Sequence, residues 1–294
     1  MELRQIRYFL AVQETGSFTR ASEKLFVTQP ALSSAVKALE EELGATLLKR
    51  SHKRVSLTAA GLRFRDRAFA ILAECNAAKR DLMDQQNQRQ MRLAILSTLN
   101  TPPINRLLHG FRTTYPEVII HLQSGSKDAL AHRLGQDQVD LIVTALSGEE
   151  ASATTLPLYQ ERFVLVVSMQ HPLATRSSVH LADLHGEPFV LRKNCEVLDQ
   201  GKRVFLTEQA QPLINCRTEE DSWALTMVRN NLAASIMAET VDAPDVVKIP
   251  IVDFGLIRTV GCLWRNHSEQ QTVQQFTAFA AQQDWAAQLH AGRD

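Results

Sequence analysis

Residues 27–40 read VTQPALSSAVKALE, and this stretch decides how the front of the chain folds. Its apolar side chains recur at i, i+3, i+4 and i+7, so one face of a helix carries Leu32, Ala35, Val36 and Leu39. Thr28 stands where an N-cap would be, and Pro30 falls in the first turn, where a missing N–H costs no hydrogen bond. The proline therefore predicts the start of a helix.

A second short helix is predicted just before this one. Gly16 ends the opening helix of the chain, Ser17 can cap the next, and Phe18, Ala21 and Leu25 share one face. Two short helices joined through Phe26 and Val27 are typical of a helix-turn-helix. The outer face of the second helix then suits a major groove, through the small or flexible polar side chains of Gln29, Ser33, Ser34 and Lys37.

The next segment, TLLKRSHKRVSL (46–57), favours DNA binding over the alternative of an ordinary helix with a solvated face. Two short apolar runs flank a basic tip, which predicts a β-hairpin, the wing of a winged helix-turn-helix. Phosphate neutralisation is expected of the basic residues, which are Lys49, Arg50, His52, Lys53 and Arg54. The alternative is a solvated basic loop.

A long helix is predicted from Thr58, its N-cap, to about Gln86. Its apolar residues, among them Leu62, Phe69 and Leu72, form a stripe too long to bury in a sixty-residue domain, so pairing with a second copy is expected. Packing on its own chain is the alternative. The polar run DQQNQRQ (84–90) reads as a hinge.

Composition and charge bound the class of protein. The 294 residues carry no net charge, but residues 1–90 hold 15 Lys and Arg against 10 Asp and Glu, whereas residues 91–294 hold 17 against 22. A basic front part suggests a polyanion partner for that part alone. No transmembrane run or signal peptide is expected, and four scattered cysteines indicate neither a disulfide scaffold nor a zinc knuckle, so the cytoplasm is the expected compartment.

From Met91 onward, strand-like runs alternate with helical segments, which predicts an α/β architecture with mostly parallel sheets. Ligands in such folds bind at the carboxyl ends of strands and near helix N-termini. The candidate ligand-binding residues are therefore Ser97, Thr98, Asn100, Ser124, Gly125, Ser126 and Thr144. For each of them, a plain helix cap or turn is the alternative.

No catalytic motif is found in the sequence: there is no G-x-S-x-G, P-loop, G-x-G-x-x-G or H-E-x-x-H. The nine histidines form no close pair with metal-ligand spacing. We therefore expect no catalytic residues, metal or cofactor. An α/β enzyme or solute-binding protein with an accessory DNA-binding head is the alternative from another class.

The run LRQIRYFLAVQETGSFTRASEKLFVTQPALSSAVKALEEELGATLLKRSHKRVSLTAAG (3–61) resembles the winged helix-turn-helix of the LysR-type transcriptional regulators. The match rests on the order and spacing of Phe9, Gly16, Ser17, Ala21, Gln29, Pro30, Leu39, Glu40, Leu43, Gly44 and Arg50. Landmarks similar to that family's effector domain follow in the right order: TTYPEV (113–118), GSKDALAHRLGQDQVDLIV (125–143), HPLA (171–174) and MVRNNLAASIMAE (227–239).

The resemblance implies a multidomain α+β chain: a winged helix-turn-helix at 1–58, a linker and dimerisation helix at 59–88, and an effector-binding domain at 91–294. That domain would be periplasmic-binding-protein-like, with one subdomain at about 91–160 and 266–294 and another at about 161–265. The resemblance also implies a homodimer or homotetramer on interrupted palindromes of double-stranded DNA, whose bending a small molecule in the cleft controls.

By position, Gln29, Pro30, Ser33 and Ser34 match family residues near bases, while Arg50 and residues 52–54 match phosphate contacts. Ser97, Thr98, Ser126 and Thr144 match positions that commonly line the effector cleft. The chain departs from the pattern at Ser34, where many relatives have a larger or basic residue. It also has Asn231 and Ala233 where glycines are usual, and asparagine tolerates a left-handed turn better than alanine.

Cys195, in NCEVLDQ (194–200), resembles the reactive cysteine of peroxide-sensing members of the family. A sensor thiol needs a lowered pKa and access to oxidant. The second cysteine of those sensors is missing, since residues 203–206 read RVFL, and Cys216 lies further along on a predicted strand. A redox-responsive regulator is therefore an alternative, beside the reading of Cys195 as an ordinary pocket or buried thiol.

Overall fold

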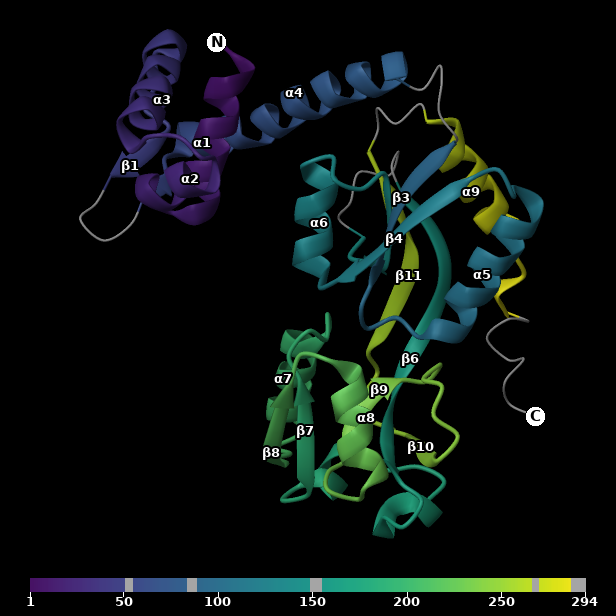
Figure 1. Ribbon diagram of the computed structural model, residues 1–294. Helices are drawn as coiled ribbons and strands as arrows, with labels where there is room; N and C mark the ends of the chain where they lie inside the picture. The colour runs from purple at the N-terminus through teal and green to yellow at the C-terminus, as the bar shows by residue number, and fades with distance from the viewer. Residues whose placement is uncertain (51–54, 84–88, 149–154, 266–269, 287–294) are drawn as a thin grey trace. The chain divides into compact units, whose positions relative to one another are not determined.

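A computed structural model describes residues 1–50, 55–83, 89–148, 155–265 and 270–286 (Figure 1). The chain divides into two compact units, with the boundary at residues 87 and 88. Each unit has a hydrophobic core of its own.

The N-terminal unit is a helix-turn-helix followed by a short hairpin and a long helix, as predicted. Its elements are α1 (Leu3–Thr15), α2 (Phe18–Lys24), α3 (Gln29–Leu43), β1 (Leu48–Arg50), β2 (Val55–Leu57) and α4 (Ala59–Met83). Strands β1 and β2 pair in antiparallel fashion. The expected continuation of the last helix to Gln86 lies outside the described residues.

The predicted helix boundaries are confirmed, but the N-cap of α3 lacks the expected side-chain hydrogen bond. Gly16 ends α1 in a left-handed conformation, and the Ser17 hydroxyl accepts a hydrogen bond from the Arg20 N–H at the start of α2. Thr28 occupies the N-cap position of α3, but its side chain makes no capping hydrogen bond. Pro30 explains this in part, because it removes one of the N–H groups that such a cap would satisfy.

The core of this unit is formed by the apolar stripe of α3 together with α1 and the beginning of α4. Leu32, Val36 and Leu39 are fully buried, and the rings of Phe9 and Phe64 meet edge to face at 5.3 Å between centroids. The first turns of α4 therefore pack on their own chain, through Phe64 and Ala68. The predicted pairing of this helix with a second copy stays a prediction.

Two polar side chains hold the hairpin against the helices. Glu40 on α3 accepts hydrogen bonds through Oε1 from the N–H groups of Leu47 at 2.7 Å and Leu48 at 3.0 Å. The Thr58 hydroxyl caps α4 by accepting from the Gly61 N–H at 2.9 Å, and it donates to the Thr46 carbonyl at 2.7 Å. The hairpin thus has a set position relative to α3 and α4.

The larger unit is an α/β structure with two sheets. Its elements in chain order are β3 (Gln90–Leu96), α5 (Thr101–Thr114), β4 (Ile119–Gly125), α6 (Lys127–Gly135), β5 (Leu141–Leu146), β6 (Thr155–Ser168), the 3-10 helices η2 (Pro172–Thr175) and η3 (Leu181–Leu184), β7 (Pro188–Arg192), α7 (Leu198–Thr207), β8 (Leu213–Thr218), α8 (Asp221–Arg229), β9 (Ser235–Ala238), β10 (Val246–Pro250), β11 (Ile257–Trp264) and α9 (Gln271–Ala281). Neither β10 nor α9 was predicted from the sequence.

The prediction of mostly parallel sheets is wrong. Strands β10, β6, β11, β5, β3 and β4 lie in this order in one sheet, with β9 also beside β6. Only β3 with β4 and β3 with β5 are parallel there, while β11 runs antiparallel to β5 and β6, and β6 runs antiparallel to β9 and β10. The smaller sheet pairs β7 and β8 in parallel. Alternation of strands and helices predicts the layers, but it does not reveal that β6 and β11 run against their neighbours.

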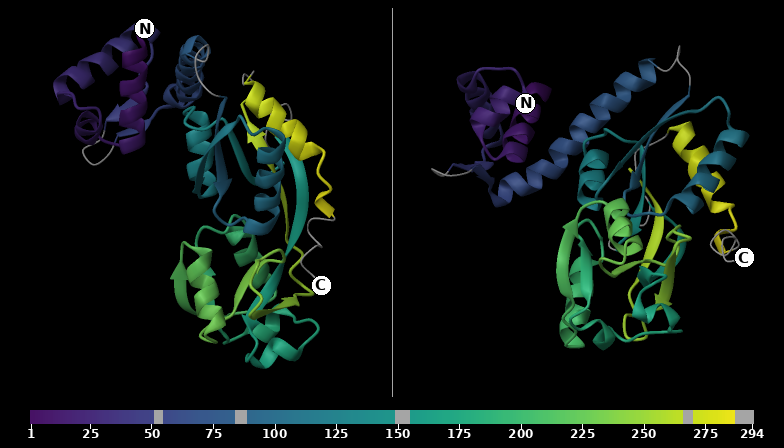
Figure 2. Two further views of the ribbon diagram at one scale, coloured as in Figure 1. Left: turned by 45° about the vertical axis from the view of Figure 1, so that its right-hand side comes forward. Right: turned by 60° about the horizontal axis from the view of Figure 1, so that its bottom comes forward.

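Long strands connect two halves of this unit, each with its own core. In the first half, α5 and α9 lie side by side on one face of the sheet (Figures 1 and 2). The rings of Phe111 and Phe276 meet there at 5.0 Å between centroids. Helix α6 buries Leu130 and Leu134 in a separate core. In the second half, α8 packs on the inner side chains of β6, and α7 packs near Phe189 and Phe254. Strand β6 contributes to the cores of both halves.

Among the residues that the structure describes, no helix combines the length and the apolar character needed to cross a membrane.

Candidate functional site

The outer face of α3 presents the polar residues that were predicted to read DNA. Gln29, Pro30, Ser34 and Lys37 are exposed, and Ser33 is half-buried. The Lys37 ammonium lies 3.5 Å from the Glu41 carboxylate one turn further on, an exposed pair of small energetic weight. A row of short side chains on an exposed helix leaves room for the backbone to approach base edges.

The wing is described only in part. Arg50 is the last residue of β1. Its side chain lies outside the described part of the chain, as do His52, Lys53 and Arg54. Their roles in binding phosphate stay predictions.

Phe26 is a feature that the sequence reasoning treated only as a spacer. Phe26 stands in the turn between α2 and α3, where its backbone has a positive φ of 54°. The residue is 96% exposed to solvent. A left-handed backbone conformation is unfavourable for a bulky residue. Because the Phe26 ring is exposed, no free energy from burying it offsets this cost. The signal in the sequence was an aromatic residue at the place where the helix-turn-helix must turn.

The larger unit holds a buried polar cluster centred on Arg258, which comes from β11. The Arg258 side chain is 2% exposed and the Glu161 and Glu196 side chains are 0% and 3% exposed. Its Nε donates to Glu161 Oε1 at 2.6 Å, and its Nη1 donates to Glu196 Oε1. Arg258 also donates to the Thr98 hydroxyl at 3.2 Å and to the Thr98 carbonyl at 3.0 Å.

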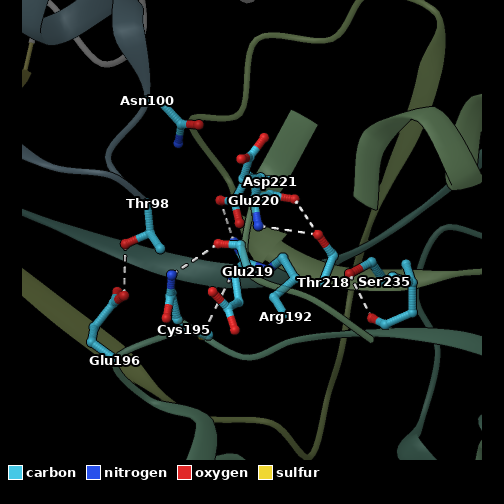
Figure 3. Close-up of polar contacts among 12 residues, drawn as sticks. Thr98, Asn100, Arg192, Cys195, Glu196, Thr218, Glu219, Glu220, Asp221 and Ser235 are labelled. Atoms are coloured by element: carbon cyan, nitrogen blue, oxygen red, sulfur yellow. Dashed lines mark hydrogen bonds and ion pairs between the residues drawn. The ribbon is translucent and has the colours of Figure 1, made fainter. Parts of the chain in front are cut away.

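The cluster joins the loop after β3 to the second half of the larger unit. Thr98, which follows β3, donates its hydroxyl hydrogen to Glu196 Oε2 at 2.7 Å, and Figure 3 shows this contact. Asn100, at the start of α5, donates to the Thr240 hydroxyl at 2.5 Å, and Thr240 in turn donates to Glu161. The loop between β3 and α5 is therefore held by residues from the second half of the unit.

The charges of the cluster do not balance, because two carboxylates face one guanidinium. Burial alone would raise the pKa of Glu196, but the charge of Arg258 and hydrogen bonds from Arg258 and Thr98 hold that pKa below its ordinary value. Burial likewise opposes the charge of Arg258, yet Glu161 and Glu196 raise its pKa. Both Glu196 and Arg258 are thus ionised at neutral pH.

The other predicted ligand-binding residues lie in the first half of the unit. Ser97 is exposed after β3, and its N–H donates to the Gly125 carbonyl at 2.9 Å. The Ser126 hydroxyl accepts from the Ala129 N–H at 3.4 Å, so it acts as a helix cap, the alternative that the sequence left open. Thr144 is buried on β5, and its hydroxyl has no hydrogen-bond partner among the described residues. Of the predicted ligand-binding residues, Thr98 and Asn100 belong to the Arg258 cluster.

The surroundings of Cys195 disfavour the thiolate form of its side chain. It is half-buried, and its sulfur accepts a hydrogen bond from Arg192 Nη2 at 3.4 Å. Burial raises the pKa of the Cys195 thiol, and the nearby guanidinium of Arg192 does not offset this, partly because Arg192 is paired with Asp221 at 2.5 Å (Figure 3). The expected condition of a lowered pKa is therefore not met.

Two cavities lie near this cluster. One of about 940 Å³ borders β6 and α5, and its lining includes Glu161 and Thr240 together with Arg106, Arg162 and Trp285. A smaller one of about 70 Å³ lies in the second half beside Cys195, between the rings of Phe189, Phe205 and Phe254. Within the described ranges, no group of three or more His, Cys, Asp or Glu side chains is placed to hold a metal ion.

Sequence reasoning missed Glu161, Glu196, Thr240 and Arg258. Arg258 lies 97 positions after Glu161 and 62 after Glu196, so no local pattern connects them. The only available signal was the position of Glu196 directly after Cys195, in a segment already singled out.

Comparisons with known proteins agree with this arrangement. A family model described as "Bacterial regulatory helix-turn-helix protein, lysR family" matches residues 3–62, and one described as "LysR substrate binding domain" matches residues 84–285. The uncharacterized HTH-type transcriptional regulator YybE of Bacillus subtilis (strain 168) is 29% identical over 269 residues, which are 90% of this chain and 92% of that protein. The DNA-binding transcriptional dual regulator OxyR of Escherichia coli (strain K12) is 26% identical over 281 residues, 90% of each chain. The crystal structure of CbnR, a LysR family transcriptional regulator, is similar with a TM-score of 0.54 at 26% identity, over 95% of this chain and 100% of that one.

Proposed function

The chain belongs to the LysR family of bacterial transcriptional regulators, and on this premise we propose that a small-molecule effector in the larger unit controls how the N-terminal unit binds or bends DNA. The protein is a DNA-binding transcriptional regulator with an effector-binding domain. The observation that carries the proposal is that one chain contains both an exposed polar face on α3 and a buried polar cluster between the two halves of the larger unit.

For DNA recognition, we propose that Gln29, Pro30, Ser33 and Ser34 lie near base edges and that Lys37, Arg50 and residues 52–54 lie near phosphates. The exposure of Gln29 and Ser34 supports this. A glutamine amide can pair with adenine through two hydrogen bonds, so its loss is expected to relax specificity at one position by about 1–3 kcal/mol.

Footprinting tests this reading. The wild type is expected to protect a site with two-fold symmetry, and Gln29→Ala is expected to lose preference at one base pair of each half-site. Gln274→Ala, which truncates an exposed glutamine on α9, is the matched control and is expected to leave the footprint unchanged. Sequence-independent binding that Gln29→Ala does not alter would contradict the assignment of α3.

For the effector, we propose a site between two subdomains, at about 91–160 with 266–294 and at about 161–265, close to Ser97, Thr98, Asn100, Ser126 and Thr144. The hydrogen bonds from Thr98 to Glu196 and from Asn100 to Thr240 support this place. A ligand that binds one arrangement of the halves better than another would shift the population of DNA-binding states.

A metabolite screen by thermal shift tests the effector site. A stabilising compound is expected, and Ser126→Ala is expected to reduce the shift, while the exposed Ser222→Ala on α8 keeps it. If no compound that alters DNA binding is affected by substitutions near Thr98, the effector acts elsewhere.

The remaining assignments are proposals as well. We propose a homodimer or homotetramer acting in the cytoplasm, and no catalytic role; light scattering in solution tests the first. The redox alternative has the similarity to OxyR in its favour, but the raised pKa of Cys195 opposes it. An oxidant response that survives Cys195→Ser would remove it.

A further inference from the structure

The Glu196 carboxylate lies between Thr98 and Arg258 and makes the contacts that a bound carboxylate ligand would make there. It comes from the loop between β7 and α7, in the second half of the larger unit, yet both of its oxygens are used by residues of other segments. Oε2 accepts from the Thr98 hydroxyl at 2.7 Å and Oε1 accepts from Arg258, and the side chain is 3% exposed. A hydroxyl and a guanidinium converging in a buried place are the groups that recognise a free carboxylate.

The charges around Arg258 make Glu196 the surplus member of the cluster. Glu161 is already paired with Arg258 through two of its nitrogens, at 2.6 and 2.5 Å, and it is further held by Thr240. One carboxylate therefore suffices to neutralise the guanidinium. An additional carboxylate beside Glu161 and Glu196 would meet two negative charges and one positive charge in a buried place, which is unfavourable. An anion can enter this position only if Glu196 leaves it.

We propose that Glu196 is an internal ligand, whose carboxylate occupies the place between Thr98 and Arg258 that an external effector must take, and that the effector is therefore a carboxylate which displaces Glu196. This inference rests on the proposed effector site and specifies its chemistry. Glu196 thereby selects the class of ligand, because a carboxylate has the same charge and the same two acceptor oxygens as the group that it replaces at Thr98 and Arg258.

Displacement would have a structural consequence. The hydrogen bond between Thr98 and Glu196 is one of those that join the loop after β3 to the second half, and another runs from Asn100 to Thr240. An external carboxylate would keep Thr98 and Arg258 satisfied while it frees the segment that precedes α7. The self-occupied form competes with the effector, so the apparent dissociation constant equals the intrinsic one divided by the fraction of molecules in which Glu196 has left the position.

Chemical rescue with a small carboxylate tests this. Glu196→Ala vacates the position, and the purified full-length variant is expected to be stabilised by sodium acetate beyond the effect of sodium chloride at equal ionic strength. With a dissociation constant of about 10 mM, 100 mM acetate would raise the Tm by about 3–6 °C. The wild type, whose position is filled, is expected to show no acetate-specific shift.

Three matched variants separate the vacated space from other effects. Glu196→Gln removes the charge but fills the position, so no rescue is expected. Glu219→Ala removes an exposed carboxylate from the same half of the unit and should behave as the wild type. Glu196→Ser also vacates the position and serves as a second test should Glu196→Ala fail to fold.

The inference is overturned if acetate stabilises the vacated variants no more than chloride does, or if it stabilises the wild type equally. These outcomes do not depend on DNA, so they leave the proposed regulation by an effector standing. Conversely, acetate-specific rescue together with a wild-type footprint that no carboxylate alters would support the internal ligand and refute effector control at this site.

Discussion

Arg258→Met is expected to destabilise the larger unit strongly at neutral pH. The substitution keeps much of the side-chain volume but removes the guanidinium that donates to Glu161, to Glu196 and to both oxygens of Thr98. Breaking a buried ion pair by removing one partner costs about 3–5 kcal/mol. For a unit of roughly 200 residues this corresponds to a fall in Tm of about 6–20 °C.

The pH dependence of this loss distinguishes its electrostatic cause from a packing defect. In the wild type, burial works to raise the pKa of Glu196, but Arg258 and Thr98 hold it below the ordinary value. Glu196 therefore stabilises the fold above its unfolded-state pKa, and this stabilisation is lost as the pH falls through its folded-state pKa. In Arg258→Met the Glu196 carboxylate stays buried without the guanidinium, so burial raises its pKa above the unfolded value and the variant loses stability as the pH rises.

The difference in unfolding free energy between wild type and Arg258→Met is thus expected to be largest near pH 7 and to shrink toward pH 5. Differential scanning calorimetry across that range measures it. Arg258→Lys, which keeps one positive charge, serves as the control and should recover part of the stability. A difference that does not vary with pH, or a variant as stable as the wild type at pH 7, would refute the reasoning.

Three further substitutions test the N-terminal unit by urea or thermal unfolding. Glu40→Ala leaves the N–H groups of Leu47 and Leu48 without their acceptor and is expected to lower the free energy of unfolding by about 1–3 kcal/mol. Glu40→Gln keeps an acceptor oxygen and is expected to lower it less, so equal losses would contradict this. Gly61→Ala would place a Cβ 2.1 Å from the Leu47 carbonyl oxygen and is expected to lower the free energy of unfolding by about 1–3 kcal/mol or more. Gly135→Ala is the control, because a Cβ at Gly135 would have no atom within 4 Å, and it should be neutral or stabilising. Phe26→Gly relieves a positive φ in an exposed residue and is expected to stabilise by about 0.5–1 kcal/mol; a loss of stability would show that the ring makes contacts in the folded unit.

Local patterns in the sequence determined the N-terminal unit closely. The stripe of Leu32, Val36 and Leu39, the glycine at 16 and the proline at 30 act within one or two helical turns, so they predict helix boundaries without knowledge of the rest of the chain. The same holds for most strands of the larger unit, because alternation is a property of a few consecutive residues. Asn231 was likewise expected to tolerate a left-handed turn, and its φ is 54°.

Only the tertiary structure decided the direction of the strands and the composition of the polar cluster. The apolar residues of β6 and β11 predict strands but not their direction, and the antiparallel pairing of these strands depends on the path of the chain between them. Glu196, Arg258 and Thr98 are separated by 62 to 160 positions in the sequence, and only the fold buries them together. Burial makes their hydrogen bonds strong, because water no longer competes for the carboxylate, the guanidinium and the hydroxyl. The raised pKa of the Cys195 thiol has the same origin, because it results from burial by side chains of the folded unit.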